Sequence, residues 1–358
     1  MDNNEITTAR PLSRRSVLAA GAALAAAPTM FSRSARAAER CVVGTWGGDY
    51  ARLLRENIDT PLLAPKGVQV IQAVGDEAPR LAQLVAQRQL PRGTLDIACL
   101  GAPNGYLASQ KGLLETLDVA KVPNLKNVIP LLHSGDFMPD KFVPHIYSVQ
   151  GIAYNPTTVK DPPKTWNDLL DPRWKGKVGG LATAGFWVMM GAALSQGGSP
   201  DDFDKAKAYL LKLNANGLRL YAETDDMAPG FKSGEIDVGI VWLARTVMWQ
   251  NADFPVAGRV PDEGAIVYVS GMVMPKNAPD KDGAYAYMNA LLDPSAQRGF
   301  AAHMGYLPTV GDAGLTGKVA EQLALPSDAK LVQPDYPQAA KVQPEMNDWW
   351  LKNIMRKG

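Results

Sequence analysis

Short apolar runs alternate with amphipathic stretches along the chain, beginning at the segment CVVGTW, residues 41–46. A short apolar run predicts a strand, whereas apolar residues spaced three and four apart predict a helix with one buried face. The first third of the chain therefore contains three predicted strands, each followed by a helix. The strands are expected at residues 41–46, 67–75 and 94–101, and the helices at residues 49–65, 78–90 and 105–118.

The predicted helices carry their apolar residues on one side. The expected inward residues are Leu53, Leu54 and Ile58 in the first helix, and Leu81, Leu84, Val85 and Leu90 in the second. Repeated strand–helix–strand units are typical of a parallel sheet covered by helices on both faces, in which ligands bind at the carboxyl ends of the strands. The segments TWGG, residues 45–48, and CLGAPN, residues 99–104, lie at such ends.

The pattern changes after residue 147, where longer extended runs appear. Residues 148–155 and 268–275 are each extended and apolar, and each is flanked by segments of mixed helix and strand pattern. Residues 200–217 predict a strong helix, and residues 344–358 predict an amphipathic helix with Met346, Trp350 and Ile354 near one face.

Residues 1–37 have the layout of a bacterial export signal. Arg14 and Arg15 precede a weakly apolar run at residues 17–27, and Ala35 and Ala37 form a cleavage-type Ala-x-Ala. The run is far shorter than the roughly 20 residues of a membrane-spanning helix. The paired arginines resemble the twin-arginine motif, and an ordinary Sec signal is the alternative. We expect cleavage after Ala37 and a periplasmic mature chain.

Composition limits the partners and the metal chemistry. The formal net charge is +1, with 46% hydrophobic residues, which argues against a nucleic-acid partner because phosphate binding needs a concentrated basic face. The three histidines are far apart and show no metal-ligand spacing, so no metal or cofactor is expected. Cys41 and Cys99 start and end two predicted parallel strands, a stagger that disfavours a disulfide between them.

Four blocks in this order resemble the bacterial extracellular solute-binding proteins of ABC importers, of the spermidine/putrescine-binding type. The blocks are VVGTWGGDY, GIAYNPTTVKDPPKTWNDLLDPRWKGKV, GFKSGEIDVGIVWLAR and EGAIVYVSGMVMPKNAPDKDGAYAYMNALLDPSAQRGFAAHMGYLPT. The resemblance implies a two-lobed α/β fold of the type II periplasmic kind, with a mixed sheet in each lobe and two crossover strands as a hinge. We assign residues 38–149 plus 275–358 to lobe 1 and residues 150–274 to lobe 2.

The two extended runs fit the crossover strands. Gly151 lies in one and Gly271 in the other, and we interpret both as positions where backbone rotation is easy. Closure of the two lobes around the ligand is the expected motion.

The family positions that hold the ligand carry rings here. Trp46, Trp242, Tyr268 and Tyr306 occupy these positions, and flat rings can grip a cation or an apolar body. We assign Trp187 and Trp249, which are close to these positions in the sequence, to the core.

The acidic partners of polyamine binders are missing from the matching positions. Those positions hold Thr183, Phe186 and Ser270, and the second strand-end turn holds Gly101 and Pro103 in place of a hydroxyl and a ring. A dication buried without counter-ions is unfavourable, so the sequence argues against spermidine or putrescine as the ligand.

The remaining candidates favour a compact acid or zwitterion. Arg245 can fork onto a carboxylate, sulfonate or phosphonate, or can be an ordinary helix-surface residue. Gly47 and Gly48 expose amide groups at a helix start, where an anionic group is favoured. Asp49 is expected to cap that helix, with an ammonium contact as the alternative. Asp225 is a minor candidate for ligand contact.

Taken together, these features predict the monomeric substrate-binding component of an ABC importer, which closes over a small organic solute and delivers it to an inner-membrane permease. The alternatives are a true polyamine-binding protein, a ferric-iron-binding protein, and a binding protein that serves a receptor. This chain lacks the adjacent tyrosines that ferric-iron-binding proteins use, which disfavours that alternative. No nucleophile–base grouping or phosphate loop is recognisable, so an enzyme is not expected.

Overall fold

The computed structural model of the chain describes residues 39–134 and 137–357. The predicted export signal, with its paired arginines and its expected cleavage position, lies outside these residues. Within the described ranges, no helix combines the length and the apolar character that a membrane crossing requires.

Strand β1 (Glu39–Thr45) lies between two parallel neighbours, β2 (Val68–Val74) and β3 (Ile97–Gly101). Each strand is followed by a helix, as the pattern predicted: α1 (Gly48–Leu54), α2 (Glu77–Gln87) and α3 (Ala102–Gln110). Helix α1 continues into a π-helical segment, Arg55–Leu63. The predicted inward residues Leu53, Leu54 and Ile58 are fully buried. Leu90 is 49% exposed and lies beyond the end of α2, so its predicted place on the buried face was wrong.

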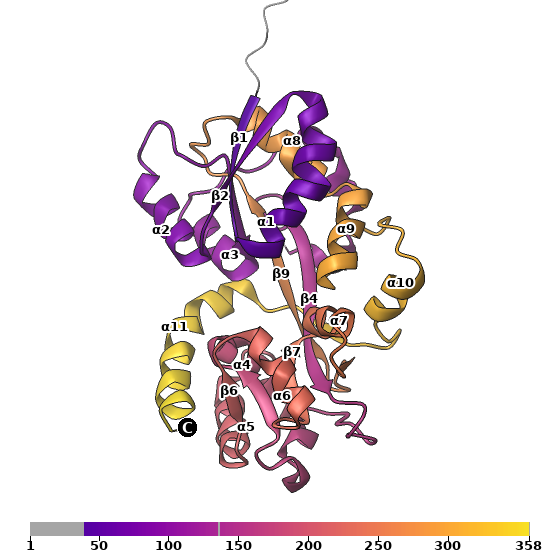
Figure 1. Cartoon of the computed structure of the whole chain (residues 1–358). Coiled ribbons are helices and arrows are strands. Elements are labelled where there is room, and N and C mark those ends of the chain that lie inside the picture. Colours follow the sequence, from indigo (N-terminus) through magenta and orange to yellow (C-terminus); the bar gives the residue numbers. More distant parts are fainter. Residues whose placement is uncertain (1–38, 135–136, 358) are drawn as a thin grey trace, which may run out of the picture. The chain divides into compact units, whose positions relative to one another are not determined.

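Two long antiparallel strands extend the sheet beyond β3. Strand β9 (Ala265–Val273) pairs with β3 on one side and with β4 (Val143–Tyr154) on the other, and the two run side by side in Figure 1. The second half of β4 pairs with β7 (Val238–Trp242) and β8 (Ala257–Arg259). The main strand order is β2-β1-β3-β9-β4-β7-β5-β6, so the extended runs predicted at residues 148–155 and 268–275 are the shared strands.

The second part of the sheet has its own parallel strands and helices. Strands β5 (Val178–Leu181) and β6 (Arg219–Tyr221) are parallel to each other, and β5 is parallel to β7. The associated helices are α4 (Gly185–Ser195), α5 (Phe203–Ala215), α6 (Met227–Ser233) and α7 (Leu243–Asn251). The last part of the chain adds α8 (Lys281–Leu291), α9 (Pro294–Met304), β10 (Leu307–Pro308), α10 (Gly317–Leu323), β11 (Leu331–Val332) and α11 (Tyr336–Asn353).

The buried side chains form two large clusters, one on each part of the sheet. The first contains residues of β1, β3, α1, α8 and α9, and the second contains residues of β7, α4 and α5. The amphipathic pattern of the last helix is confirmed, because Met346, Trp350 and Ile354 are buried. These three side chains join the second cluster, although we assigned residues 275–358 to lobe 1. The lobe boundaries themselves stay a prediction.

Gly151 on β4 and Gly271 on β9 are required for close packing. A methyl group at Gly151 would lie 2.6 Å from the carbonyl oxygen of Arg259, and one at Gly271 would meet the carbonyl oxygen of Val143. Neither glycine has a positive φ angle. The glycines therefore let neighbouring backbones approach, which is a different reason from the backbone rotation that we inferred from the sequence.

A buried polar chain links α1, β3 and β4 inside the first cluster. The Tyr50 hydroxyl lies 2.7 Å from Nδ1 of His145 and 3.2 Å from Sγ of Cys99. Cys41 and Cys99 are both free and buried, which agrees with the predicted absence of a disulfide between them. Burial raises the pKa of Cys99 to about 12 and lowers the pKa of His145 to about 3, so the thiol and the imidazole are both neutral at pH 7.

Gly151→Ala should destabilise the protein by about 1–3 kcal/mol, because overpacking against a backbone carbonyl forces the strand to move. Chemical denaturation measures this change. Gly180→Ala is the matched control, since a methyl group at that buried strand position would lie 3.6 Å from its nearest neighbour. Equal stability of the two variants would contradict the close-packing account.

Protonation of His145 in the unfolded chain should lower the stability of the folded protein in acid. Its folded pKa of about 3 lies below the unfolded value, so the unfolded chain alone takes up the proton as the pH falls below about 6.5. The His145 contribution to the free energy of unfolding should fall by about 1.4 kcal/mol per pH unit from about pH 6.5 towards pH 3.

Urea denaturation between pH 4 and pH 7 tests this expectation. His145→Asn should give a flatter pH profile than the native chain, whereas the same change at the exposed His303 should not. Parallel profiles of the native chain and His145→Asn would show that the imidazole is not the group responsible.

Candidate functional site

Three aromatic rings meet near β4, the strand that pairs with β9 on one side and with β7 on the other. Trp242 ends β7, Tyr268 lies in the middle of β9, and Trp187 is in the first turn of α4. The Trp242 and Tyr268 ring centroids are 5.0 Å apart, and Trp187 stands edge-on to both at 5.3 and 5.7 Å. All three side chains are half-buried, so the cluster presents ring surface outward. We call these three residues the aromatic cluster.

Trp187 packs against the second core cluster, as we assigned it. Its half-buried ring also contacts both predicted site rings, which the sequence did not lead us to expect. The available signal was its place four residues after Thr183, in a segment where the family holds ligand. Trp249, by contrast, is 4% exposed, as expected of a core residue.

Trp46 lies apart from the aromatic cluster, at the end of β1. Its ring stands edge-on to Tyr50, with centroids 5.1 Å apart, and the Arg80 guanidinium lies 5.5 Å from its centroid. In the described part of the chain, no ring contact joins Trp46 to any of the three residues of the aromatic cluster. The structure thus brings Trp242 and Tyr268 together directly, and holds Trp46 on a separate element.

The start of α1 differs from our expectation for Asp49. Gly47 occupies the N-cap position, and Gly48 has a φ angle of +60°, which favours glycine. No side-chain bond caps the helix. Asp49 instead forms an ion pair with Arg52 at 3.0 Å, so its predicted capping role was wrong. Both glycines are exposed, as an amide contact to a solute would require.

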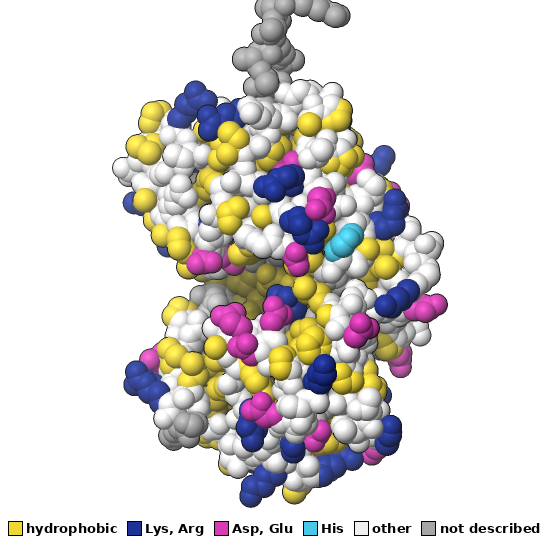
Figure 2. All heavy atoms as spheres, in the orientation of Figure 1, with side chains coloured by type: hydrophobic (Ala, Val, Ile, Leu, Met, Phe, Trp, Pro, Cys, Tyr) yellow, Lys and Arg dark blue, Asp and Glu magenta, His cyan; other side chains and the backbone are white. Residues whose placement is uncertain are grey.

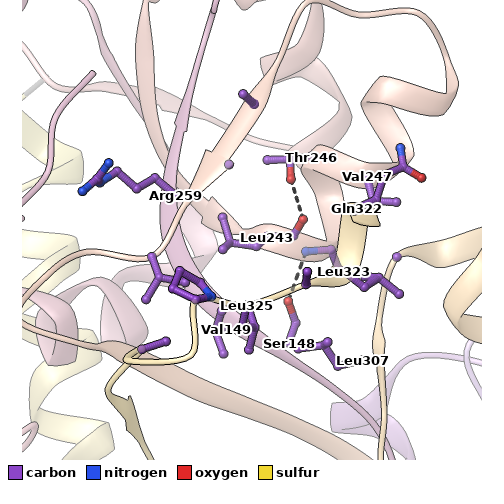
Figure 3. A pocket seen from close by; sticks show the side chains of 18 of the residues that line it. Ser148, Val149, Leu243, Thr246, Val247, Arg259, Leu307, Gln322, Leu323 and Leu325 are labelled. Carbon is purple, nitrogen blue, oxygen red and sulfur yellow. Dashed lines mark hydrogen bonds between the residues drawn. The ribbon is translucent and has the colours of Figure 1, made fainter. Parts of the chain in front are cut away.

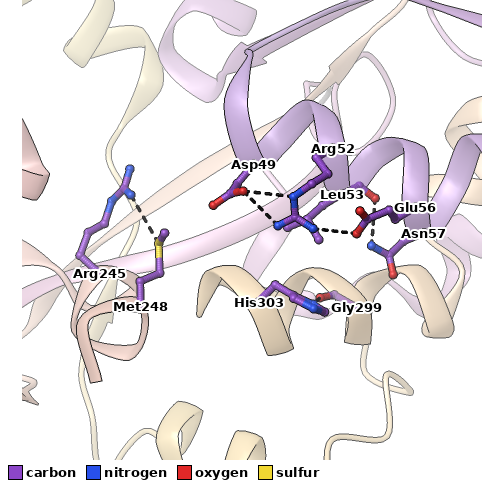
Figure 4. Close-up of polar contacts among 9 residues, drawn as sticks. All are labelled: Asp49, Arg52, Leu53, Glu56, Asn57, Arg245, Met248, Gly299 and His303. Atoms are coloured by element: carbon purple, nitrogen blue, oxygen red, sulfur yellow. Dashed lines mark hydrogen bonds and ion pairs between the residues drawn. The ribbon is translucent and has the colours of Figure 1, made fainter. Parts of the chain in front are cut away.

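Arg245 extends from the first turn of α7 and is only partly paired. Its Nη1 atom donates to Sδ of Met248 at 3.4 Å and lies 4.0 Å from the Asp225 carboxylate, as Figure 4 shows for Met248. The Asp225 side chain is 80% exposed, so the pair is weak. Burial raises the pKa of the Tyr306 phenol, and the positive charge of Arg245 acts to lower it, which places Arg245 near Tyr306.

A carboxylate that we did not predict lies at the end of β3. Glu77, the first residue of α2, accepts hydrogen bonds at Oε1 from the Gly101 amide at 2.7 Å and from Asn104 Nδ2 at 2.8 Å. Gly101 is therefore a contact of this carboxylate, and a methyl group there would lie 3.4 Å from Oε1. An acidic residue in a first helical turn is ordinarily explained by the helix dipole, so no pattern in the sequence pointed to a ligand contact at Glu77.

The other two predicted residues lie in different surroundings. Ser270 is fully buried on β9, with its hydroxyl 4.0 Å from Sγ of Cys99. Thr183 is exposed in the short turn Ala182–Ala184, just before α4. Phe186, which replaces an expected acid, is 3% exposed and belongs to the second core cluster.

The face shown in Figure 2 is hollowed at mid-height, between the ends of α2 and α3 and the ends of α4 and α6. Hydrophobic side chains line the floor of this recess, and side chains of both charges stand at its rim. The carboxyl ends of parallel strands, where ligands bind in such sheets, lead into this part of the molecule.

A separate cavity of about 840 Å³ lies on another face of α7. Leu243 and Val247 of α7, Ser148 of β4 and Leu325 of the segment after α10 help to line it, as Figure 3 shows. None of the predicted site residues lines this cavity. The residues of α7 on either side of Arg245 face it, so α7 separates it from the predicted site.

Among the described residues, no three histidine, cysteine or carboxylate side chains group in a way that could hold a metal ion. The chemistry of the predicted site is therefore that of rings, one guanidinium and one carboxylate. Such an arrangement can bind a small charged solute.

Comparisons with known proteins agree with this architecture. The family model described as bacterial extracellular solute-binding protein matches residues 67–327. The spermidine/putrescine-binding periplasmic protein of Escherichia coli strain K12 is 28% identical over 250 residues, which cover 65% of this chain and 70% of that protein.

One further relative and one solved structure are similar to this chain. A candidate 2-aminoethylphosphonate-binding periplasmic protein of Salmonella typhi is 31% identical over 167 residues, which cover 44% of this chain and 48% of that protein. The solved structure of the Atu4243-GABA receptor superimposes with a TM-score of 0.75 at 23% identity, covering 87% of this chain and 96% of the receptor. The structural likeness confirms the two-lobed α/β fold predicted for this chain.

Proposed function

Because the chain belongs to the family of bacterial extracellular solute-binding proteins, we propose that it captures one small organic solute and delivers it to an ABC permease in the inner membrane. The observation that carries this proposal is the half-buried aromatic cluster of Trp187, Trp242 and Tyr268, together with the incompletely paired Arg245, three residues after Trp242. Rings that remain partly open on a rigid sheet are suited to stacking on a ligand rather than to filling a core.

The ligand that these residues favour is a compact acid or zwitterion. Arg245 can form charge-assisted hydrogen bonds with a carboxylate or phosphonate, and the rings can cover the rest of a small body. Thr183, Phe186 and Ser270 provide no carboxylate for a second ammonium group, which disfavours a polyamine. The Salmonella typhi relative, named for an aminophosphonate, supports this choice of ligand class.

Capture would proceed by closure of lobe 1, residues 38–149 plus 275–358, on lobe 2, residues 150–274. Strands β4 and β9 are the shared elements and would act as the hinge. Trp46, Gly47 and Gly48 would then approach the ligand from the end of β1, opposite the aromatic cluster. The chain would act in the periplasm as a monomer after removal of its export signal, and a permease would recognise the closed state.

A thermal-shift screen of the chain from residue 38 tests the proposed ligand class. Amino acids, aminophosphonates, simple carboxylates, spermidine and putrescine form the panel, because a ligand that binds only the folded state raises the melting temperature. We expect stabilisation by an acid or zwitterion with a dissociation constant in the micromolar range, about −8 kcal/mol. Stabilisation by spermidine or putrescine alone would instead make the chain a polyamine-binding protein.

Trp242→Ala and Trp46→Ala should each weaken binding of the stabilising solute about tenfold or more, because each removes a stacking surface. Trp242→Phe and Trp46→Phe keep a ring and should retain most of the affinity. Isothermal titration gives the dissociation constants, and circular dichroism verifies the fold. Unchanged affinity in both alanine variants would remove these rings from the site.

A further inference from the structure

We infer that Glu77 is the residue that selects for an ammonium group on the ligand, so that the site takes a short zwitterion whose amino and acid groups are at opposite ends. The inference deepens the proposed function and rests on it. Its basis is the geometry at the end of β3, where the structure holds the carboxylate of Glu77. The positions of this chain that match the acidic residues of polyamine binders provide no carboxylate.

The carboxylate of Glu77 is fixed from two sides. Its Oε1 atom accepts from the Gly101 amide at 2.7 Å and from Asn104 Nδ2 at 2.8 Å, both at the start of α3. No hydrogen bond to Oε2 is found among the described residues, so this oxygen is available as an acceptor. The side chain is half-buried, which strengthens an interaction with a cation relative to one in open water.

Arg80, the positive charge nearest along the same helix, lies within electrostatic range of Glu77, since the Glu77 charge acts to raise the pKa of Arg80, but its hydrogen bonds go elsewhere. Arg80 is buried, and it donates to the carbonyl oxygens of Cys99, at 2.6 Å, and of Gly75. No ion pair between Arg80 and Glu77 is found in the described part of the chain. The second oxygen of the Glu77 carboxylate therefore remains open to an incoming ammonium group.

Glu77 and the aromatic cluster are held together by the pairing of β3 with β9. Gly101, whose amide binds Glu77, is opposite Ser270 in the register of these strands, and Ser270 is two residues from Tyr268. Burial raises the pKa of Tyr268 well above its usual value, and the nearby Tyr306, Glu77 and Cys99 raise it further. Tyr268 therefore lies within the electrostatic range of Glu77.

The opposite charge is that of Arg245, in the first turn of α7 and three residues after Trp242. Arg245 acts on Tyr306 as Glu77 acts on Tyr268, with the opposite sign. A ligand that covers the aromatic cluster would thus have a carboxylate near one of its ends and a guanidinium near the other. This polarity matches an amino acid or aminophosphonate with a short spacer, whereas a diamine would place one ammonium group near Arg245.

A purely structural role for Glu77 is the rival explanation, because its Oε1 bonds also join α2 to α3. Glu77→Gln separates the two roles. The glutamine amide keeps an oxygen that can accept from Gly101 and Asn104, while the negative charge is lost. Asp76→Asn is the matched control, since it removes the same charge from the exposed neighbouring residue, whose side chain makes no capping bond.

Isothermal titration with two pairs of probes is the experiment. The pairs are 4-aminobutyrate with butyrate, and 2-aminoethylphosphonate with ethylphosphonate, which differ only by the amino group. We expect the native chain to prefer the amino member of at least one pair by about tenfold or more, and Glu77→Gln to reduce that preference to about threefold or less. Asp76→Asn should keep the native preference.

Two results would overturn the inference while leaving the proposed function intact. One is a Glu77→Gln variant with the native preference, and the other is a native chain that binds the members of each pair equally well. Failure of the proposed function looks different, because the native chain would then bind none of these probes and no solute of the thermal-shift panel. The melting temperature of unliganded Glu77→Gln, if lowered by several degrees, would assign the residue to the structural role.

Discussion

The antiparallel pairing of β4 with β9 is the constraint on which the rest of the structure depends. These strands are buried along almost their whole length, and through them the parallel strands on one side are connected with those on the other. Gly271 of β9 has no room for a side chain because the Val143 carbonyl of β4 lies so close, and Gly151 of β4 is restricted in the same way by the Arg259 carbonyl of β8. A register shift by one residue would turn every buried side chain to the wrong face, so this pairing fixes the positions of both halves of the site.

One residue of β9 escapes full burial, and it is the centre of the aromatic cluster. Tyr268 is half-buried in a strand whose other residues are buried, and it is the ring that Trp187 and Trp242 approach from separate elements. Three rings from α4, β7 and β9 can hold one another in place without loss of their outward surface. Such mutual support costs little conformational entropy on ligand binding, because the rings are already ordered.

The two charged candidates, Arg245 and Glu77, come from other elements than the three rings. Arg245 and Glu77 each keep part of their hydrogen-bonding capacity free, while other nearby charges, such as Asp49 with Arg52, are satisfied by neighbours on their own helix. A charge that is partly desolvated and incompletely paired gains from a complementary ligand group. This difference separates residues that can bind a solute from those that only solvate the surface. The cavity behind α7 lacks the predicted rings and is a different surface of the same helix.

The sequence by itself determined the elements and the general architecture. Strong periodicity located β1, β2, α1 and the buried face of α11, because the alternation of apolar and polar residues depends on local geometry alone. It also made Trp242, Tyr268 and Arg245 candidates for ligand contact, since their segments resemble those of a known family. Only the tertiary structure decided that the Trp187 ring contacts those of Trp242 and Tyr268. It also decided that Asp49 pairs with Arg52 and that Glu77 accepts a hydrogen bond from the Gly101 amide. These contacts join residues of separate elements, or depend on the rotamers of exposed side chains, and neither leaves a periodic trace in the chain.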